Sequence, residues 1–248
     1  MSDPQFAAVL LVLALAAFVQ GVFGLGFAMI ATPLLALFLD YQTAVLFAAV
    51  PLLVLASYWL MLNRQYLGSS GLPWTLLLGI VVGAALGVAL QVSLPQRVSL
   101  LLLAALIVFS VVLPFLQRRL IPHKKVIVRR SAPLFGLLAG TTEAALNVGA
   151  PFMVLFAGLA RLSRLQLLIA LNVCFALGKA IQISLLMFVA PVDVSLTLMV
   201  AGVLLCLLAF SLGERLAGNL PESVFRRWLS IFLLVMATLL VIRSQLVA

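Results

Sequence analysis

Val19–Pro33 reads V-Q-G-V-F-G-L-G-F-A-M-I-A-T-P and interrupts an apolar run that is too long for one membrane crossing. No residue from Gln5 to Leu39 carries a charge, and as one straight helix these 35 residues would measure roughly 52 Å. The hydrocarbon core of a membrane is about 30 Å thick. Gly21, Gly24 and Gly26 are the positions where the backbone is free to leave the helix. The stretch therefore predicts a broken helical element.

A break at membrane depth needs partners for its freed backbone groups, because lipid tails offer no hydrogen bonds. Such breaks survive where they are buried in protein or line a water-filled cavity, and in transporters they commonly form the binding site. We therefore expect the broken element to contribute to a site.

Composition places the rest of the chain in the membrane as well. Of the 248 residues, 66% are hydrophobic and 8% are charged, which predicts several membrane-spanning helices and not a water-soluble domain. The 15 Lys and Arg residues outnumber the 6 Asp and Glu residues but, except for Lys179, lie in short loops, so they indicate membrane orientation and not nucleic-acid binding. Cys174, Cys206 and the single histidine, His123, form no disulfide framework or metal-ligand cluster, and we predict no cofactor.

The apolar runs predict two halves of one design. The first half, residues 1–117, holds the broken element at 5–39 and spans at about 41–63, 72–92 and 98–117. A basic segment follows at residues 118–130 and contains six Lys or Arg residues. The second half, residues 131–248, holds a broken element at 131–160, interrupted at Thr141–Pro151, and spans at about 165–189, 194–212 and 227–247.

Short motifs recur in the same order in both halves. Leu86-Gly87 with Leu94-Pro95 recurs 126 positions later as Leu212-Gly213 with Leu220-Pro221. Gly24–Ala28 aligns with Asn147–Pro151, 123 positions later. Together the two matches favour a duplicated unit of one broken element and three spans.

The distribution of positive charge predicts how the halves lie in the membrane. If each broken element enters the membrane and returns, twelve Lys and Arg residues in loops face one side and two, Arg97 and Arg243, face the other. If each broken element crosses completely, the split is eight to six. Because positive loops stay in the cytoplasm, we predict re-entrant elements and inverted repeats. About 16 residues precede the first break and about 12 follow it. A tilted or over-long first helix is the competing interpretation.

This arrangement predicts a multi-pass protein of the cell membrane, which would be the inner membrane of a bacterium. Its basic central segment is cytoplasmic and both termini are periplasmic. The predicted partners are the lipid bilayer, a small anion and protons, with no nucleic acid and no assigned oligomeric state.

These features resemble the sulfite exporter TauE/SafE family of membrane transporters. The likeness rests on the first break followed by Pro33, on Gly149-Ala150-Pro151, and on the Leu-Pro dipeptide late in each half, and it extends over about Ala8 to Ile242. Phe27 and Ala150 stand where the family pattern has glycine. The resemblance implies a secondary transporter, acting in export, for a small sulfur-containing anion such as sulfite, sulfoacetate or another organosulfonate.

Two charged residues lie inside the predicted hydrocarbon layer. Glu143 is the acid near the second break, where a carboxylate must be protonated, paired or hydrated. It is either a proton-coupling group or a structural cap for loose N–H groups. Lys179, in the middle of its span, either attracts the anion, pairs with Glu143, or extends toward the membrane surface. For Gln20, Asn172 and Gln182, hydrogen bonding between helices is the simpler role.

The predicted site combines both breaks. Helix arms that begin at about Phe27 and Ala150 would point their positive N-terminal ends at the bound anion. The predicted substrate-binding residues are Gly24, Gly26, Phe27, Asn147, Gly149, Ala150 and Lys179, with Glu143 for proton coupling and no metal or catalytic residue.

The rival hypothesis is an intramembrane enzyme or accessory subunit that uses Glu143 as an acid or base. The absence of a second intramembrane carboxylate counts against it. No Walker-type phosphate loop occurs, so coupling would come from an ion gradient, a partner or the gradient of the substrate.

Overall fold

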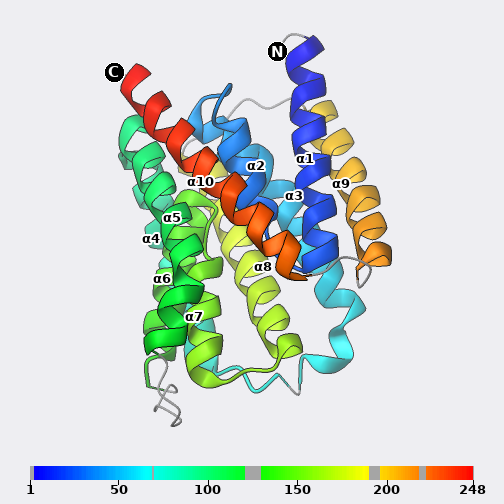
Figure 1. The fold of residues 1–248 in the computed structure, drawn as a ribbon, viewed down its shortest axis with the longest axis vertical. Coiled ribbons are helices and arrows are strands. Elements are labelled where there is room, and N and C mark those ends of the chain that lie inside the picture. The colour runs from blue at the N-terminus through cyan, green and yellow to red at the C-terminus, as the bar shows by residue number, and fades with distance from the viewer. Residues whose placement is uncertain (1–2, 69, 121–129, 190–195, 218–221, 248) are drawn as a thin grey trace. The chain divides into compact units, whose positions relative to one another are not determined.

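The computed structural model describes residues 3–68, 70–120, 130–189, 196–217 and 222–247. Within these ranges the chain is all-helical, as predicted, with ten α-helices and a 3-10 turn at Arg64–Tyr66 (Figure 1). In chain order the helices are α1 Asp3–Phe23, α2 Phe27–Leu35, α3 Tyr41–Leu62, α4 Trp74–Ser93, α5 Gln96–Leu120, α6 Ala132–Leu146, α7 Ala150–Ala160, α8 Arg164–Val189, α9 Leu196–Leu216 and α10 Glu222–Leu246.

Seven of the described helices are long and apolar enough to cross a membrane, namely α1, α3, α4, α5, α8, α9 and α10. The six predicted spans are all found as helices, with the largest differences at the end of α9, which continues to Leu216, and at the start of α10, at Glu222. Three predicted features lie outside the described residues: most of the basic central segment, the first residues of the 194–212 span, and Leu220-Pro221.

Large apolar side chains are exposed along the candidate spans. Leu11, Phe188 and Leu208 have exposed fractions of 71%, 87% and 67%. A water-soluble protein rarely exposes so many large apolar side chains together, whereas a membrane protein presents them to lipid. The exposed surface therefore agrees with the composition.

Two pairs of helices form the predicted broken elements, α1 with α2 and α6 with α7. α1 has 21 residues and α2 has 9. The predicted lengths of about 16 and 12 were therefore wrong, because α1 begins at Asp3 and stays helical through Gly21 to Phe23. Helices α6–α10 repeat the order of α1–α5, with a helix, a short helix after a break, and three long helices.

The chain divides into two compact units, and each unit takes helices from both halves of the sequence. The first unit comprises residues 1–55, 95–108 and 191–248, and the second comprises residues 56–94 and 109–190. Thus α1, α2, α9 and α10 belong to the first unit, whereas α4, α6, α7 and α8 belong to the second. The predicted halves at residues 1–117 and 131–248 describe a repeat along the sequence and not the two compact units. This repeat stays a prediction.

In the first unit, α1 packs in parallel against α9. The Cys206 thiol lies 3.5 Å from the Leu13 carbonyl oxygen, and further along both helices Gly21 lies against Phe210. A Cβ atom added at Gly21 would overlap the Phe210 carbonyl, and one at Gly213 would overlap the Phe18 carbonyl. Gly21 therefore permits close helix packing and does not end the helix, contrary to the prediction.

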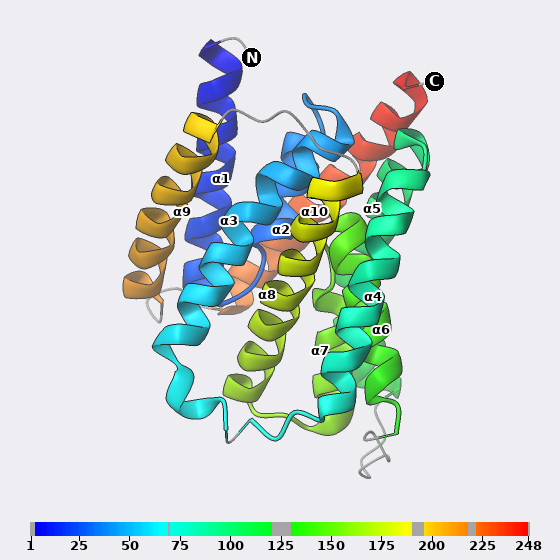
Figure 2. The same cartoon turned by 180° about the vertical axis from the view of Figure 1, so that it is seen from behind.

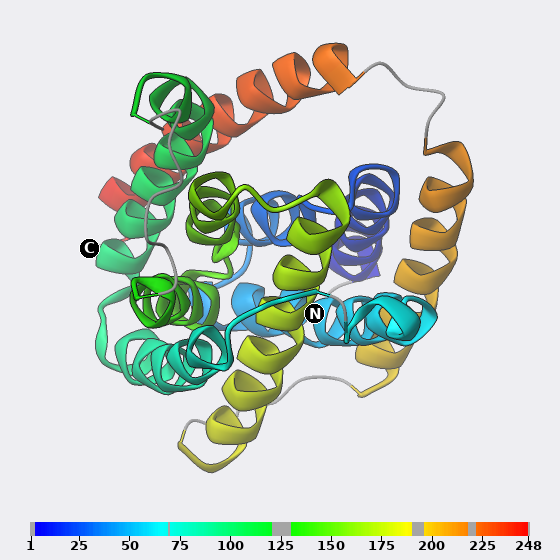
Figure 3. The same ribbon diagram turned by 90° about the horizontal axis from the view of Figure 1, so that it is seen from below.

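In the second unit, α4 and α6 lie side by side (Figure 3). They pack in parallel through glycines on both helices. Added Cβ atoms would overlap backbone carbonyls of the facing helix at Gly79, Gly83, Gly87, Gly136 and Gly140. Gly87 faces the Thr141 carbonyl in the same way that Gly213 faces the Phe18 carbonyl. The two glycines are 126 positions apart and the two carbonyls 123. The offsets seen in the sequence therefore recur as packing contacts.

Candidate functional site

The first break is formed by two glycines with positive φ. Gly24 has a φ of 78° and Gly26 a φ of 117°, values that side chains with a Cβ atom rarely adopt. The Gln20 side chain closes the break, since its Oε1 accepts a hydrogen bond from the Phe27 N–H at 3.1 Å and its Nε2 donates to the Gly24 carbonyl at 3.3 Å. From there α2 runs back toward the end at which α1 begins (Figure 2).

The second break is shorter than predicted. α6 continues to Leu146, so the predicted opening at Thr141–Leu146 is helical. Asn147 ends α6 in the left-handed conformation, with a φ of 58°, and α7 begins at Ala150. Asparagine tolerates this conformation better than most residues because its short amide bonds locally. The α-helical hydrogen bonds thus continue up to Asn147, whose N–H donates to the Glu143 carbonyl at 3.1 Å.

After the second break, α7 folds back along α6. The rings of Phe135 and Phe156 lie 5.8 Å apart, and Gly149 lies against Ala139 and Glu143, where an added Cβ atom would be 2.7 Å from the Ala139 carbonyl oxygen. Contacts therefore pair early residues of α6 with late residues of α7. The two helices form an antiparallel hairpin.

Equivalent side chains cap both short helices. Glu143 Oε2 accepts a hydrogen bond from the Gly149 N–H at 2.8 Å, at the start of α7, as Gln20 Oε1 does from the Phe27 N–H at the start of α2. Glu143 and Gln20 are 123 positions apart, the same offset as the aligned breaks. The first N–H groups of a helix have no partner inside it, so a side-chain oxygen stabilises them.

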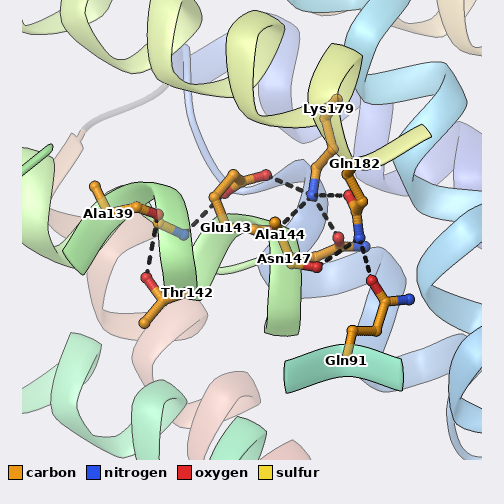
Figure 4. Close-up of polar contacts among 9 residues, drawn as sticks. Gln91, Ala139, Thr142, Glu143, Ala144, Asn147, Lys179 and Gln182 are labelled. Carbon is orange, nitrogen blue, oxygen red and sulfur yellow. Dashed lines mark hydrogen bonds and ion pairs between the residues drawn. The ribbon is translucent and has the colours of Figure 1, made fainter. Parts of the chain in front are cut away.

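Lys179 on α8 reaches the second break and contacts four oxygen atoms (Figure 4). Its Nζ lies 2.8 Å from Glu143 Oε1 and donates to the Glu143 carbonyl at 2.6 Å, to Gln182 Oε1 at 2.9 Å and to Asn147 Oδ1. The side chains of Glu143 and Lys179 are both 0% exposed. Lys179 is therefore paired with Glu143 and does not extend toward the membrane surface.

Gln182 extends this network to a third helix. Its Nε2 donates to the Ala144 carbonyl at 2.6 Å and to Gln91 Oε1 on α4 at 2.8 Å. Gln91 and Gln182 are both buried. A buried network whose members are all hydrogen-bonded holds its groups in one arrangement. The lysine ammonium group is thus fixed from two directions, by the break and by the glutamines.

The structure brings together four of the predicted site residues in the second unit: Glu143, Asn147, Gly149 and Lys179 (Figure 4). Ala150 follows directly as the first residue of α7. The other three, Gly24, Gly26 and Phe27, lie together in the first unit.

Gln91 was not predicted as a site residue, because a glutamine near the end of a span carries no distinguishing signal in the sequence. The equivalence of Gln20 and Glu143 could have been predicted from the sequence, because extending the alignment of the two breaks four residues upstream pairs these positions. Gln182 does bond between helices, whereas Asn172 donates to the Leu168 carbonyl of its own helix at 2.9 Å. Among the described residues, no group of three or more potential metal ligands occurs.

Comparison with known proteins gives one match. A model of the protein family described as sulfite exporter TauE/SafE matches residues 9–240, nearly the whole chain. No curated protein and no solved structure matches the chain.

Proposed function

Because the chain belongs to the sulfite exporter TauE/SafE family of membrane transporters, we propose that it carries a small sulfur-containing anion across the cell membrane by alternating access. Sulfite, sulfoacetate and other organosulfonates are the candidate substrates, and export is the proposed direction. Membership of a transporter family makes the chain a transporter and not an enzyme, which removes the hypothesis that Glu143 is a catalytic acid or base.

The observation that carries this proposal is the charged second break. A buried ammonium group and the N-terminus of α7 converge on one carboxylate, so the break already stabilises negative charge away from water. Since Pro151 has no N–H and the Gly149 N–H is bonded to Glu143, the first turn of α7 offers donors at Ala150 and Phe152. These donors and Lys179 are the proposed contacts of the substrate oxygens.

The first break supplies the proposed counterpart in the other half. The N-terminus of α2 is capped by the neutral amide of Gln20. Gly26, which precedes the helix and has a positive φ, has no side chain to cover the backbone there. Broken helices in transporters commonly bind anionic groups through helix N-termini and ions through unwound backbone. Gly24, Gly26 and Phe27 stay in the proposal on this ground.

We propose that both helix pairs are re-entrant, and a contact at the second pair supports this. Gln166 Nε2, at the start of α8, donates to the Ser70 carbonyl in the loop before α4, at 3.3 Å. Only α4, α5 and the α6–α7 pair lie between these residues. With α4 and α5 crossing, Ser70 and Gln166 share a membrane face only if α6–α7 returns to the face it entered.

Three contacts within the first unit support the same path for α1–α2. Arg243, near the end of α10, donates to the Leu39 carbonyl at 2.7 Å, which puts Leu39, four residues beyond the end of α2, at the end of the unit where α10 ends. With α9 and α10 both crossing, α9 begins at that face. α1 runs parallel to α9, as its contacts through Leu13 and Gly21 indicate, so it begins there too. The pair therefore enters and leaves at one face.

Counterflow in proteoliposomes tests the transport proposal. Vesicles containing the purified chain and unlabelled sulfite should accumulate radiolabelled sulfite transiently, and sulfoacetate or thiosulfate added outside should compete if it is a substrate. Empty vesicles and vesicles with the Gly26→Leu variant are the controls. The proposal is wrong if neither sulfite nor any of the organosulfonates gives counterflow with a correctly folded chain.

A further inference from the structure

We propose that the Glu143 carboxylate is a built-in anion that the transported anion replaces, so that one proton enters the site with each substrate molecule. The inference rests on the proposed anion transport and names its coupling.

The carboxylate occupies Lys179, a proposed contact of the substrate, and the Gly149 N–H beside the proposed donors at Ala150 and Phe152. Oε2 takes the Gly149 N–H, and Oε1 faces the Lys179 ammonium group at 2.8 Å. Within the described residues, Oε1 has no hydrogen-bond partner besides this ion-pair contact. A second anion therefore has no place at these donors until the carboxylate has left them.

The first half shows that the cap itself needs no ionisable group. Gln20 occupies the position equivalent to Glu143 and caps the Phe27 N–H with an amide oxygen. A neutral glutamine is thus sufficient to satisfy the first N–H group of a short helix. The negative charge of Glu143 serves something besides capping, and its position against Lys179 indicates what.

Lys179 does not depend on the carboxylate for its place. The Glu143 carbonyl, Asn147 Oδ1 and Gln182 Oε1 also accept hydrogen bonds from its Nζ, and Gln182 is held in turn by the Ala144 carbonyl and Gln91. If the carboxylate turns away, the ammonium group remains in a fixed position. It is then available to the substrate.

Charge balance requires that Glu143 binds a proton when the substrate anion binds. With Glu143 ionised, the buried pair is neutral; with a substrate anion added, the same group of residues would carry a net negative charge away from water, which is costly. If Glu143 accepts a proton on one carboxylate oxygen, the neutral acid leaves the lysine and the anion takes its place at unchanged net charge. The proton returns to water when the anion leaves.

Within the part of the chain that the structure describes, the groups that face Glu143 offer no other charge to compensate a second anion. Lys179 and the Cys174 thiol of α8 are the titratable groups that interact with it, α7 contributes the Gly149 N–H, and α4 reaches the network through the uncharged Gln91. A monovalent anion would therefore move together with one proton and without net charge. An inward proton gradient opposes export by this route, so net export requires an outward gradient of the anion that exceeds the opposing proton gradient.

The test uses methanesulfonate, which remains a monovalent anion across the working pH range. A gradient of methanesulfonate across proteoliposomes should drive protons in the same direction, as read by a trapped pH-sensitive dye. A potential imposed with potassium and valinomycin should leave the rate of anion flux unchanged. Sulfoacetate is measured in parallel.

Glu143→Gln is the decisive variant because glutamine resembles the protonated acid. Its methanesulfonate flux should continue without proton movement and become sensitive to the imposed potential. Glu214→Gln, which removes a carboxylate on α9 outside both breaks, should retain the proton movement of the wild type. Glu143→Asp keeps a carboxylate if the glutamine variant fails to fold. Lys179→Met should weaken methanesulfonate binding, measured as thermal stabilisation, at acidic and alkaline pH alike.

Anion flux in the wild-type chain without accompanying protons would overturn this inference while leaving the transport proposal intact. Proton movement that persists in Glu143→Gln would also overturn it. Absence of flux for every sulfur-containing anion would instead contradict the transport proposal.

Discussion

At the scale of single residues, Glu143 and Lys179 form a neutral unit in which each charge requires the other. Both side chains are fully buried, and Lys179 Nζ lies 2.8 Å from Glu143 Oε1. Removing one partner of a buried pair typically costs about 3–5 kcal/mol, because the remaining charge is left uncompensated, whereas replacing both is often neutral. The pair is therefore a requirement of charge balance more than a source of stability.

A double-mutant cycle tests this view. Glu143→Gln and Lys179→Met, made singly, should each lower the stability of the chain in detergent, by as much as about 3–5 kcal/mol if the remaining charge finds no water. The double variant should be less destabilised than the sum of the two single variants. Thermal unfolding of the purified proteins measures both quantities. Additive losses would mean that the two charges do not interact in the folded chain.

The sequence was sufficient to find this pair and insufficient to find its surroundings. Glu143 and Lys179 stand out because a charge inside an apolar run is rare. Asn147 was singled out by its place in the break. Gln91 belongs to the network only because α4 packs closely against α6, and that contact depends on glycines far apart in the sequence.

At the scale of helices, close packing through glycine organises each compact unit. The α4–α6 contact brings backbones together at five glycines, where no Cβ atom fits. In membranes, small residues of this kind allow van der Waals contact and close approach between helices, which replaces the hydrophobic effect as the driving force. The sequence predicted the helices within a few residues, but it did not indicate which helices pair.

A single methyl group should be enough to disturb this contact. Gly83→Ala places a Cβ atom against the Leu137 carbonyl, and we expect a loss of about 1–3 kcal/mol from overpacking. Gly68→Ala is the matched control, since nothing lies within 4 Å of its added Cβ atom. Thermal unfolding in detergent compares the two. Equal stability of both variants would contradict the close approach of α4 and α6.

The glycines of the first break act through conformation and not through packing. At Gly26, the nearest atom to an added Cβ is a Val19 methyl group at 3.4 Å, an ordinary contact, but the φ of 117° is closed to other residues. Here the sequence identified the break correctly. It misplaced Gly21, because a glycine that permits close packing looks the same in a sequence as one that ends a helix.

Gly26→Leu should therefore abolish transport and leave membrane insertion largely intact. The leucine forces α2 to start elsewhere and displaces the Phe27 N–H from Gln20. Counterflow of labelled sulfite measures transport, and extraction from membranes with size-exclusion analysis measures insertion and folding. Full transport by this variant would remove the first break from the proposed site.

At the scale of the whole molecule, the membrane topology that we propose rests on the positions of the basic loops and on the re-entrant paths proposed above. A cysteine at Lys124 should be labelled by an impermeant maleimide from the cytoplasm only, and cysteines at Ser2 and Ala248 from outside. The native Cys174 and Cys206 are buried, so the background should be low. Labelling of both termini from the cytoplasm would restore full crossings in place of re-entrant pairs.

The packing of α1 against α9 also has a consequence for the synthesis of the protein. Leu13 and its neighbour Cys206 are 193 residues apart in the chain. At a synthesis rate of roughly 5–20 residues per second, α1 leaves the ribosome about 10–40 seconds before its partner. During that interval the small-residue face of α1, which includes Gly21, lies open in the bilayer. A chaperone or the insertion machinery that shields this face would decide how much of the newly made protein escapes degradation.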